Sequence, residues 1–231
     1  MKYLPHVLIA SGIMLALTSI VYAAKRGVDE TKLNIQSIHI IGDSQTQRHI
    51  GEAFSEEFSP RVVTYFGREG SDPLQYLNTP QLLQDSLPHT CTDLIYIQLG
   101  DNGIQSSESV RRLIDFYRRK CPDALFVWGG PMRAVDPTIR TSYISDDPTS
   151  PRYLPTYNAT RSVWNDRARQ GALDTNIMFF DNYNIQNAQP SSSAFSNTRG
   201  GDGIHLLENS AKTHAQLFRS FLEGYNLNVT S

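Results

Sequence analysis

The stretch Ser37-Ile38-His39-Ile40-Ile41-Gly42-Asp43-Ser44 decides the fold that this sequence predicts. Its first part, residues 37–41, is a short isoleucine-rich run of the length expected for a strand buried on both faces of a sheet. A glycine and two small polar residues follow directly, which is typical of a tight turn. We therefore expect residues 37–41 to form a strand and Ser44 to lie where that strand turns into a helix.

Four more apolar or aromatic runs of similar length follow along the chain, and helical patterns separate them. The further strands are expected at residues 62–66, 94–99, 125–128 and 177–180. Helices are expected at residues 46–58, 73–87, 106–119, 157–169 and 207–225. Strands that alternate with helices predict an α/β fold of three layers, α/β/α, in which a five-stranded parallel sheet is connected by right-handed crossovers.

Composition fits one ordinary domain. The chain has 231 residues, of which 39% are hydrophobic and 19% charged, so it can bury a single core. Its formal net charge of -2 gives no broad basic field that would attract nucleic acid, and we expect no nucleic-acid partner. We expect a monomer.

The first two dozen residues differ from the rest. Lys2 precedes a nearly continuous apolar stretch at residues 7–21, and small residues at a cleavage-like spacing follow in Val21-Tyr22-Ala23. This pattern predicts a secretory signal peptide at residues 1–24, which leaves residues 25–231 as one domain. We expect the cleaved protein to be periplasmic or secreted and to have no membrane span. The alternative is a retained anchor, because the stretch is about long enough to span a bilayer and Lys25-Arg26 follows it.

Two cysteines occupy equivalent places before two of the expected strands. Cys91 and Cys121 each precede an apolar run by three residues, at 94–99 and 124–128. If those runs are neighbouring parallel strands, the thiols lie at the same edge of the sheet, within reach of a bridge. Since export to an oxidising compartment permits disulfides, we expect Cys91 to pair with Cys121; the alternative is two partly buried free thiols.

Polar and glycine-rich turns follow four of the five expected strands. Ser44 follows the first, Gly70 the second, Asn102 the third and Gly129-Gly130-Pro131 the fourth. The carboxyl ends of parallel strands share one edge of the sheet, where ligands of open α/β sheets bind. These residues are therefore expected on one rim. Two long loops reach the same rim and are expected to form the walls of a cleft; they are residues 132–155 and 182–201.

Four short motifs appear in a fixed order across this chain. They are Gly42-Asp43-Ser44, Gly67-Arg68-Glu69-Gly70-Ser71, Gly100-Asp101-Asn102-Gly103 and Asp202-Gly203-Ile204-His205. Together they resemble the four sequence blocks of the SGNH (GDSL) esterase family. One position departs from the pattern, because Gly103 stands where the third block usually ends in Asp. The resemblance implies a flavodoxin-like SGNH hydrolase fold.

The resemblance also assigns roles to the residues of these motifs. Ser44 would be the nucleophile, His205 the base that takes its proton, and Asp202 the carboxylate that orients the imidazole. The Ser44 N–H, the Gly70 N–H and the Asn102 side-chain amide would bind the oxyanion. We expect no metal and no cofactor. Outside the resemblance, Ser44 has the alternative of an ordinary helix cap, Asn102 of a turn residue and Asp202 of an acid at a helix N-terminus.

These observations predict an exported serine esterase that hydrolyses short acyl esters, with O-acetyl groups on a cell-envelope or extracellular carbohydrate as the expected substrate. Short exported members of the family resemble carbohydrate O-acetylesterases, and the rim loops carry polar and tyrosine side chains that suit a sugar: Tyr143, Tyr153, Tyr157, Asn182, Tyr183 and Asn184. Three alternatives remain: a lipase or thioesterase with the same triad, a glycan O-acetyltransferase, and a non-catalytic glycan-binding protein.

Overall fold

The five expected strands form one parallel sheet in the computed structural model, which describes residues 33–134, 144–188 and 202–229. The strand order is β3-β2-β4-β5-β6, so β2 lies inside the sheet and the chain crosses over it to reach β4. Every neighbouring pair is parallel, and Gly42 at the end of β2 lies between Gly67 and Gln98. The strands are β2 (Ser37–Gly42), β3 (Val62–Gly67), β4 (Leu94–Gln98), β5 (Leu125–Gly129) and β6 (Met178–Phe180).

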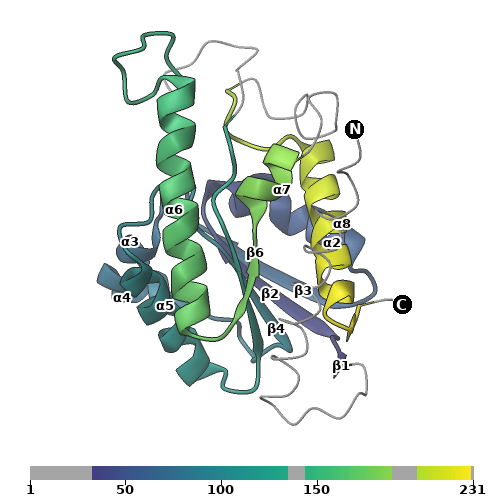
Figure 1. Cartoon of the computed structure of the whole chain (residues 1–231). Coiled ribbons are helices and arrows are strands. Elements are labelled where there is room, and N and C mark those ends of the chain that lie inside the picture. Colours follow the sequence, from purple (N-terminus) through teal and green to yellow (C-terminus); the bar gives the residue numbers. More distant parts are fainter. Residues whose placement is uncertain (1–32, 135–143, 189–201, 230–231) are drawn as a thin grey trace, which may run out of the picture.

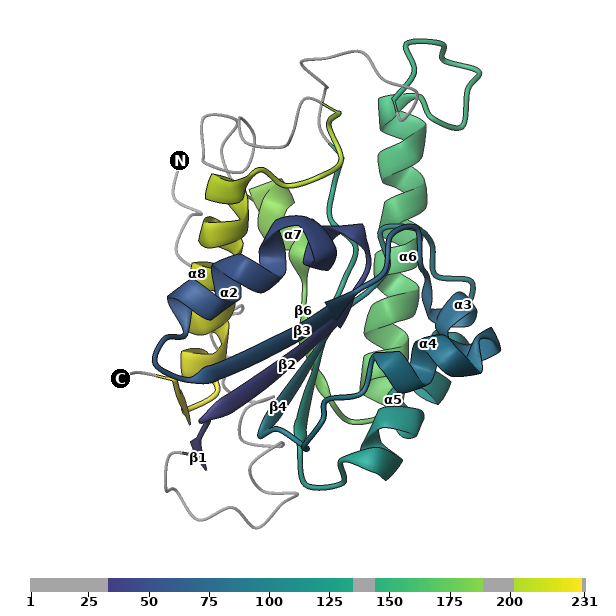
Figure 2. The ribbon, with the colours of Figure 1, turned by 180° about the vertical axis from the view of Figure 1, so that it is seen from behind.

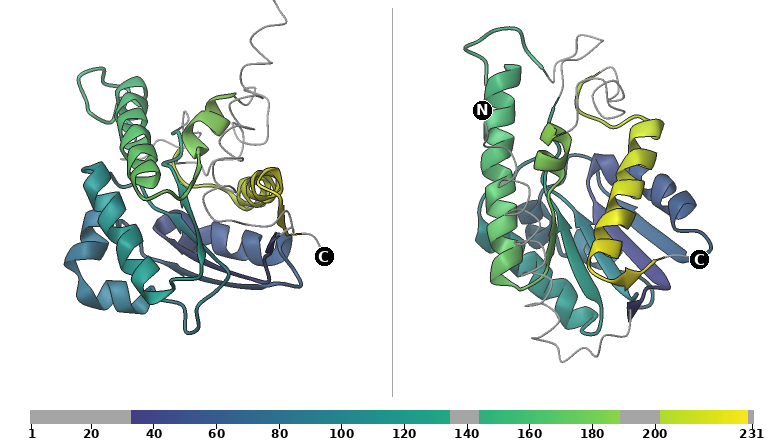
Figure 3. Two further views of the ribbon diagram at one scale, coloured as in Figure 1. Left: turned by 60° about the horizontal axis from the view of Figure 1, so that its bottom comes forward. Right: turned by 45° about the vertical axis from the view of Figure 1, so that its right-hand side comes forward.

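Helices cover both faces of this sheet (Figures 1 and 2). One face carries α2 (Gly51–Glu57), α7 (Asn182–Ala188) and α8 (Glu208–Gly224), and the left view of Figure 3 shows the sheet between the two helical layers. The other face carries α3 (Pro73–Asn78), α4 (Pro80–Asp85), α5 (Ser107–Lys120) and α6 (Leu154–Asp174). The three-layer α/β/α fold predicted from the alternation of patterns is confirmed.

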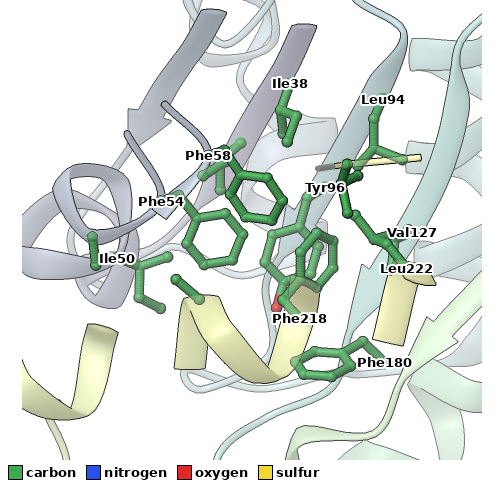
Figure 4. Packing of buried hydrophobic residues seen from close by; sticks show 14 of the residues in the cluster. Ile38, Ile50, Phe54, Phe58, Leu94, Tyr96, Val127, Phe180, Phe218 and Leu222 are labelled. Atoms are coloured by element: carbon green, nitrogen blue, oxygen red, sulfur yellow. The ribbon is translucent and has the colours of Figure 1, made fainter. Parts of the chain in front are cut away.

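Two hydrophobic clusters fill the spaces between the sheet and the helices, because successive strand residues point to opposite faces. On the α2 and α8 side, Tyr96 of β4 packs among aromatic rings, and its ring centroid lies 4.3 Å from that of Phe218 (Figure 4). On the other side, Ile95 and Ile97 of the same strand pack against α5. Strands β2, β4 and β5 are therefore buried on both faces, as their apolar runs predict. The same prediction is wrong for β3, which lies at the edge of the sheet and leaves Val62 and Tyr65 exposed.

Several helix boundaries differ from the predicted ones for local reasons. The predicted helix 73–87 is two helices, because Pro80 has no N–H to continue α3 and instead opens α4. The predicted helix 157–169 is longer at both ends, and Pro155 lies in its first turn, where proline is tolerated. The predicted helix 46–58 begins as a π-helical turn, Thr46–Ile50, before it continues as α2.

The structure also contains elements that were not predicted. Helix α7 lies at the start of the segment 182–201 that was expected to be a loop. A two-stranded parallel sheet pairs β1 (Leu33–Asn34) with β7 (Leu227–Asn228), so the two ends of the described chain lie side by side. Strands this short leave too little sequence pattern to be recognised.

Cys91 and Cys121 form a disulfide, with Cα atoms 5.4 Å apart. Cys91 precedes β4, and Cys121 directly follows α5, ahead of β5. The predicted signal peptide, residues 1–24, lies outside the described residues. Within the described part of the chain, no helix is both long enough and apolar enough to cross a membrane.

Candidate functional site

Ser44 lies at the point where β2 gives way to a helical turn. The turn needs glycine at position 42, since a Cβ atom there would lie 1.9 Å from Thr46 Oγ1 and 2.9 Å from the Gln98 carbonyl oxygen. Ser44 is in the first turn of the following helix, where backbone N–H groups have no partner within the helix. Its side chain is almost buried, so its surroundings are fixed by the protein rather than by solvent.

A hydrogen-bonded chain of three side chains connects the two ends of the sequence. His205 Nε2 lies 3.0 Å from Ser44 Oγ, although 161 residues separate them in the sequence. His205 Nδ1 lies 2.6 Å from Asp202 Oδ2. A carboxylate that accepts from Nδ1–H leaves Nε2 as an acceptor, so this arrangement can take the proton from the serine hydroxyl.

One tight turn shapes the part of this chain that holds Asp202 and His205. Asp202 Oδ1 accepts hydrogen bonds of 2.9 Å from the backbone N–H groups of both Ile204 and His205. Gly203 in the middle has a φ of 74°, which glycine adopts without strain. Burial alone would raise the pKa of Asp202, but the hydrogen bonds from the His205 ring and these two N–H groups outweigh it and hold that pKa below its usual value. Asp202 is therefore ionised at neutral pH.

Of the residues expected to bind an oxyanion, Asn102 contacts Asp43, which directly precedes Ser44, and Gly70 directly precedes Ser71, which Asn102 also contacts. Asn102 Nδ2 lies 3.2 Å from the Ser71 carbonyl oxygen and 3.4 Å from Asp43 Oδ2, so its amide group joins the second and first motifs. Gly70 lies exposed in the turn after β3 with a φ of 71°, and no atom lies within 4 Å of the position of a Cβ. Gly67, the other glycine of that motif, ends β3 opposite Gly42. Gly70 is thus the glycine of the turn, and Gly67 belongs to the sheet.

A buried ion pair between Arg161 and Asp101 supports the third motif. The guanidinium of Arg161 on α6 donates to Asp101 Oδ1 and to the Met132 carbonyl oxygen, and both of its partners are buried. Asp101 Oδ1 also accepts from the Met132 N–H at 2.8 Å. The pair therefore ties the loop after β4 to the loop after β5. Burial opposes a charged Arg161, but the neighbouring Asp101 carboxylate outweighs it and raises the pKa of Arg161.

Asp43 has a different environment, although it is also fully buried. Burial and the nearby Asp101 carboxylate raise its pKa well above the usual value, and they outweigh the opposing effects of the Gln45 N–H and the Arg161 guanidinium. Asp43 Oδ1 accepts a 3.0 Å hydrogen bond from the Gln45 N–H, which fixes the backbone around Ser44. Asp43 and Asp101 support the loops of the site.

Two residues that support the site carried no signal in the sequence. Arg161 belongs to a helix, where a single arginine is normally solvated, and only its burial against Asp101 distinguishes it. Gln45 follows Ser44 directly and makes two hydrogen bonds to the segment that carries His205. Each depends on a contact between residues that are far apart in the sequence.

The described residues also bear on two other kinds of site, a metal site and a surface hollow. No group of three or more His, Cys, Asp and Glu side chains within the described residues is arranged to hold a metal ion. A surface hollow of about 310 Å³ lies over α3 and α5, and neither Ser44 nor His205 lines it. The rim residue Tyr143 lies outside the described residues.

No protein-family model matches this sequence, and no curated protein matches it. Several solved structures, however, are similar to this structure. The structure is similar to that of a candidate GDSL-like lipase from Parabacteroides merdae, with a TM-score of 0.61 and 16% identity over 87% of this chain and 100% of that one. This chain has the fold of the SGNH (GDSL) hydrolases.

Two further proteins with this fold are similar to the chain. One is a member of the lipolytic G-D-S-L family from Veillonella parvula, with a TM-score of 0.52 and 16% identity over 79% of this chain and 96% of that one. The other is the C-terminal catalytic domain of peptidoglycan O-acetyltransferase A from Streptococcus pneumoniae, with a TM-score of 0.51 and 16% identity over 83% of this chain and 94% of that one. At this level of identity the likeness concerns the fold alone.

Proposed function

We propose that this protein is a serine esterase of the SGNH type that cleaves short acyl esters through an acyl-enzyme on Ser44. The observation that carries the proposal is the hydrogen-bonded chain from Ser44 Oγ through His205 to Asp202, with distances of 3.0 and 2.6 Å. An ordinary cap serine needs no histidine, and a helix N-terminal acid needs no imidazole partner. All three groups together form the arrangement that nucleophilic acyl transfer requires.

The reaction follows from this geometry. Ser44 Oγ attacks the acyl carbon while His205 Nε2 takes its proton, and the carbonyl electrons move to the oxygen. The resulting oxyanion is bound by the Ser44 and Gly70 N–H groups and the Asn102 amide; one such donor is worth about 3 kcal/mol. The C–O bond to the leaving alcohol then breaks as His205 returns the proton to that alcohol. Water, deprotonated by His205, attacks the acyl-enzyme in the same way and releases the acid.

We further propose that the acyl group is an acetyl group carried by a cell-envelope or extracellular carbohydrate. The likeness in fold to a peptidoglycan O-acetyltransferase domain supports this choice. Of the polar rim residues, Asn182 gives no support, because it is buried and its amide donates to Gln98 Oε1 and the Gly130 carbonyl oxygen. The apolar segment at residues 7–21 and the disulfide between Cys91 and Cys121 support export.

The same likeness favours a second candidate, transfer of the acetyl group to a sugar hydroxyl. The acyl-enzyme on Ser44 is common to both reactions, and they differ only in whether water or a sugar hydroxyl attacks it. Product analysis separates them: hydrolysis releases acetate, whereas transfer produces a newly acetylated acceptor glycan.

The test begins with aryl acetates and a fluorophosphonate probe, which labels an activated serine. Wild-type protein should turn over the ester and be labelled, and Ser44→Ala should lose both properties. Ser55→Ala is the matched control, because Ser55 on α2 donates only to the Gly51 carbonyl oxygen. If wild type shows neither turnover nor labelling, the esterase proposal fails. A preference for long-chain aryl esters over acetates would instead favour a lipase and contradict the carbohydrate substrate.

Mass spectrometry of acetylated envelope glycans then tests the substrate. Glycans treated with wild type should lose the mass of their acetyl groups, and glycans treated with Ser44→Ala should keep them. An esterase that acts on aryl acetates and leaves every such glycan unchanged would contradict the carbohydrate assignment alone.

A further inference from the structure

We propose that Gln45 is a positioning residue that holds the histidine-bearing segment against the nucleophile. The inference rests on the proposed function and concerns how His205 is kept within reach of Ser44. Gln45 Nε2 donates a 2.9 Å hydrogen bond to the Ile204 carbonyl oxygen, and Gln45 Oε1 accepts a 3.0 Å hydrogen bond from the Leu206 N–H. One side chain therefore binds the backbone on both sides of His205.

The location of these two bonds makes them strong. Gln45 and Leu206 are each only 2% exposed, so water does not compete for either bond. The amide presents one donor and one acceptor, which match the carbonyl group and the N–H group that it faces. Two bonds that flank a single residue fix both the place and the rotation of its backbone, and hence the direction in which the imidazole points.

Gln45 itself is held in place. Its own N–H donates to Asp43 Oδ1 at 3.0 Å, and Asp43 is fully buried at the end of β2. The contacts thus run without a break from the central strand through Gln45 to the segment around His205. By contrast, the bonds from Asp202 to the Ile204 and His205 N–H groups lie within that segment, so they shape it without joining it to the sheet.

The residue type at this position departs from the G-D-S-L signature. The G-D-S-L signature, after which the similar protein from Veillonella parvula is named, has leucine directly after the serine. A leucine side chain has neither a donor nor an acceptor, so it could form neither of the two hydrogen bonds that Gln45 makes. Gln45 therefore adds a polar connection between nucleophile and base at a place where the signature has an apolar side chain.

The first test is Gln45→Met, which keeps the length and volume of the side chain and removes both hydrogen bonds. A small displacement of a reacting group costs on the order of 100-fold in rate, so kcat for an aryl acetate should fall about 10- to 100-fold. KM should change little, because Gln45 is buried beneath the site. A kcat within twofold of wild type would overturn the proposal.

Gln98→Met is the matched control. Gln98 is also fully buried, but its amide oxygen accepts from Tyr96 and Asn182 rather than from the His205 segment. Both variants lose a buried amide, and only Gln45→Met loses the connection to His205. The proposal expects a clearly smaller loss of kcat for Gln98→Met. Equal losses of kcat in the two variants would mean that removing any buried amide has this effect, and would overturn the proposal.

Gln45→Glu tests the role of Gln45 through the pH dependence of activity, which would not change if Gln45 only stabilised the fold. A neutral glutamic acid still accepts from the Leu206 N–H and donates its own proton to the Ile204 carbonyl oxygen. An ionised glutamate has no proton to donate, so its oxygen repels that carbonyl oxygen. Burial favours the neutral form, and the proton is lost as pH rises. The ratio of Gln45→Glu to wild-type kcat/KM should therefore fall with increasing pH.

This ratio also decides the case if Gln45→Met does not fold. A ratio that stays constant across the pH range in which wild type is active would overturn the proposal. Its failure is distinct from failure of the proposed function. Wild type that neither hydrolyses esters nor is labelled at Ser44 contradicts the esterase, whereas active wild type with equally active Gln45 variants contradicts only the role of Gln45.

Discussion

The two halves of the site are held in place by different means. Ser44 follows β2, which lies inside the sheet with β3 on one side and β4 on the other, so backbone pairing and close packing around Gly42 determine its place. Asp202 and His205 lie in a turn ahead of α8, where side chains make the connections. The proposed nucleophile is thus placed by the fold itself, and the proposed base is placed by a few hydrogen bonds that single substitutions can remove.

The largest expected effect comes from the histidine half. His205→Ala should reduce kcat by about 10⁶-fold, and Asp202→Ala by about 10⁴-fold, as for comparable triads. Asp202 has the smaller effect because a backbone group or water can partly orient the ring. Steady-state kinetics with an aryl acetate measure both, and exposed His89→Ala is the control. Comparable activity for His205→Ala and His89→Ala would contradict the assignment of the base.

The largest expected effect on stability comes from the buried ion pair that supports the third motif beside the serine half. Arg161→Met leaves the Asp101 carboxylate buried without its partner and should lower the free energy of unfolding by about 3–5 kcal/mol. Arg111→Met makes the same change at a solvated pairing with Glu108 and Asp115 and should cost much less, because water screens those charges. Urea denaturation measures both, and similar losses for the two variants would show that burial of the pair is unimportant.

A pH-dependent effect on stability is expected at Asp43, which directly precedes Ser44 in the serine half. Its folded-state pKa is raised by burial and by Asp101, so the folded protein keeps a proton that the unfolded chain has lost. Wild-type stability from this group is therefore greatest below the ordinary carboxyl pKa of about 4 and declines as pH rises above it. Asp43→Asn does not titrate and should gain stability relative to wild type as pH rises. A difference in unfolding free energy that does not change between acidic and neutral pH would contradict this assignment.

The smallest expected effect is at Gly70. Its φ of 71° is unfavourable for alanine by about 1 kcal/mol, but open space surrounds the position of the new Cβ. Gly70→Ala should therefore lower the unfolding free energy by about that amount and leave the N–H group in place, with a modest loss of kcat. Thermal unfolding and kinetics measure both, and a loss of several kcal/mol would mean that the turn packs more tightly than the structure indicates.

Much of the fold was predictable from the sequence, because buried parallel strands leave uninterrupted apolar runs. The four largely buried strands could be recognised in this way, and the edge strand β3, although half exposed, has a similar apolar run. Helix ends were less predictable: Pro80 divides a helix, whereas Pro155 begins one, and only the tertiary structure distinguishes the two. Helix α7 lies in a segment whose polar composition is typical of a loop.

The motif residues of the site were also predictable, and the structure brings Ser44, Asp202 and His205 into contact. The supporting residues were not. Arg161 contacts a residue 60 positions away, and Gln45 contacts residues about as far away as His205 is from Ser44. A single sequence carries no record of such contacts, because neither residue type is unusual in a helix or a turn.

The distance of 161 residues between Ser44 and His205 has a consequence for synthesis of the chain. Ser44 and most of the sheet leave the ribosome long before His205 does, so under the proposed mechanism a growing or truncated chain carries a serine that no histidine activates. The site becomes complete only when α8 packs on the sheet and brings the preceding turn with it. Reactivity of Ser44 toward a fluorophosphonate would then report that the last helix has docked, and the enzyme would stay inert until its folding is finished.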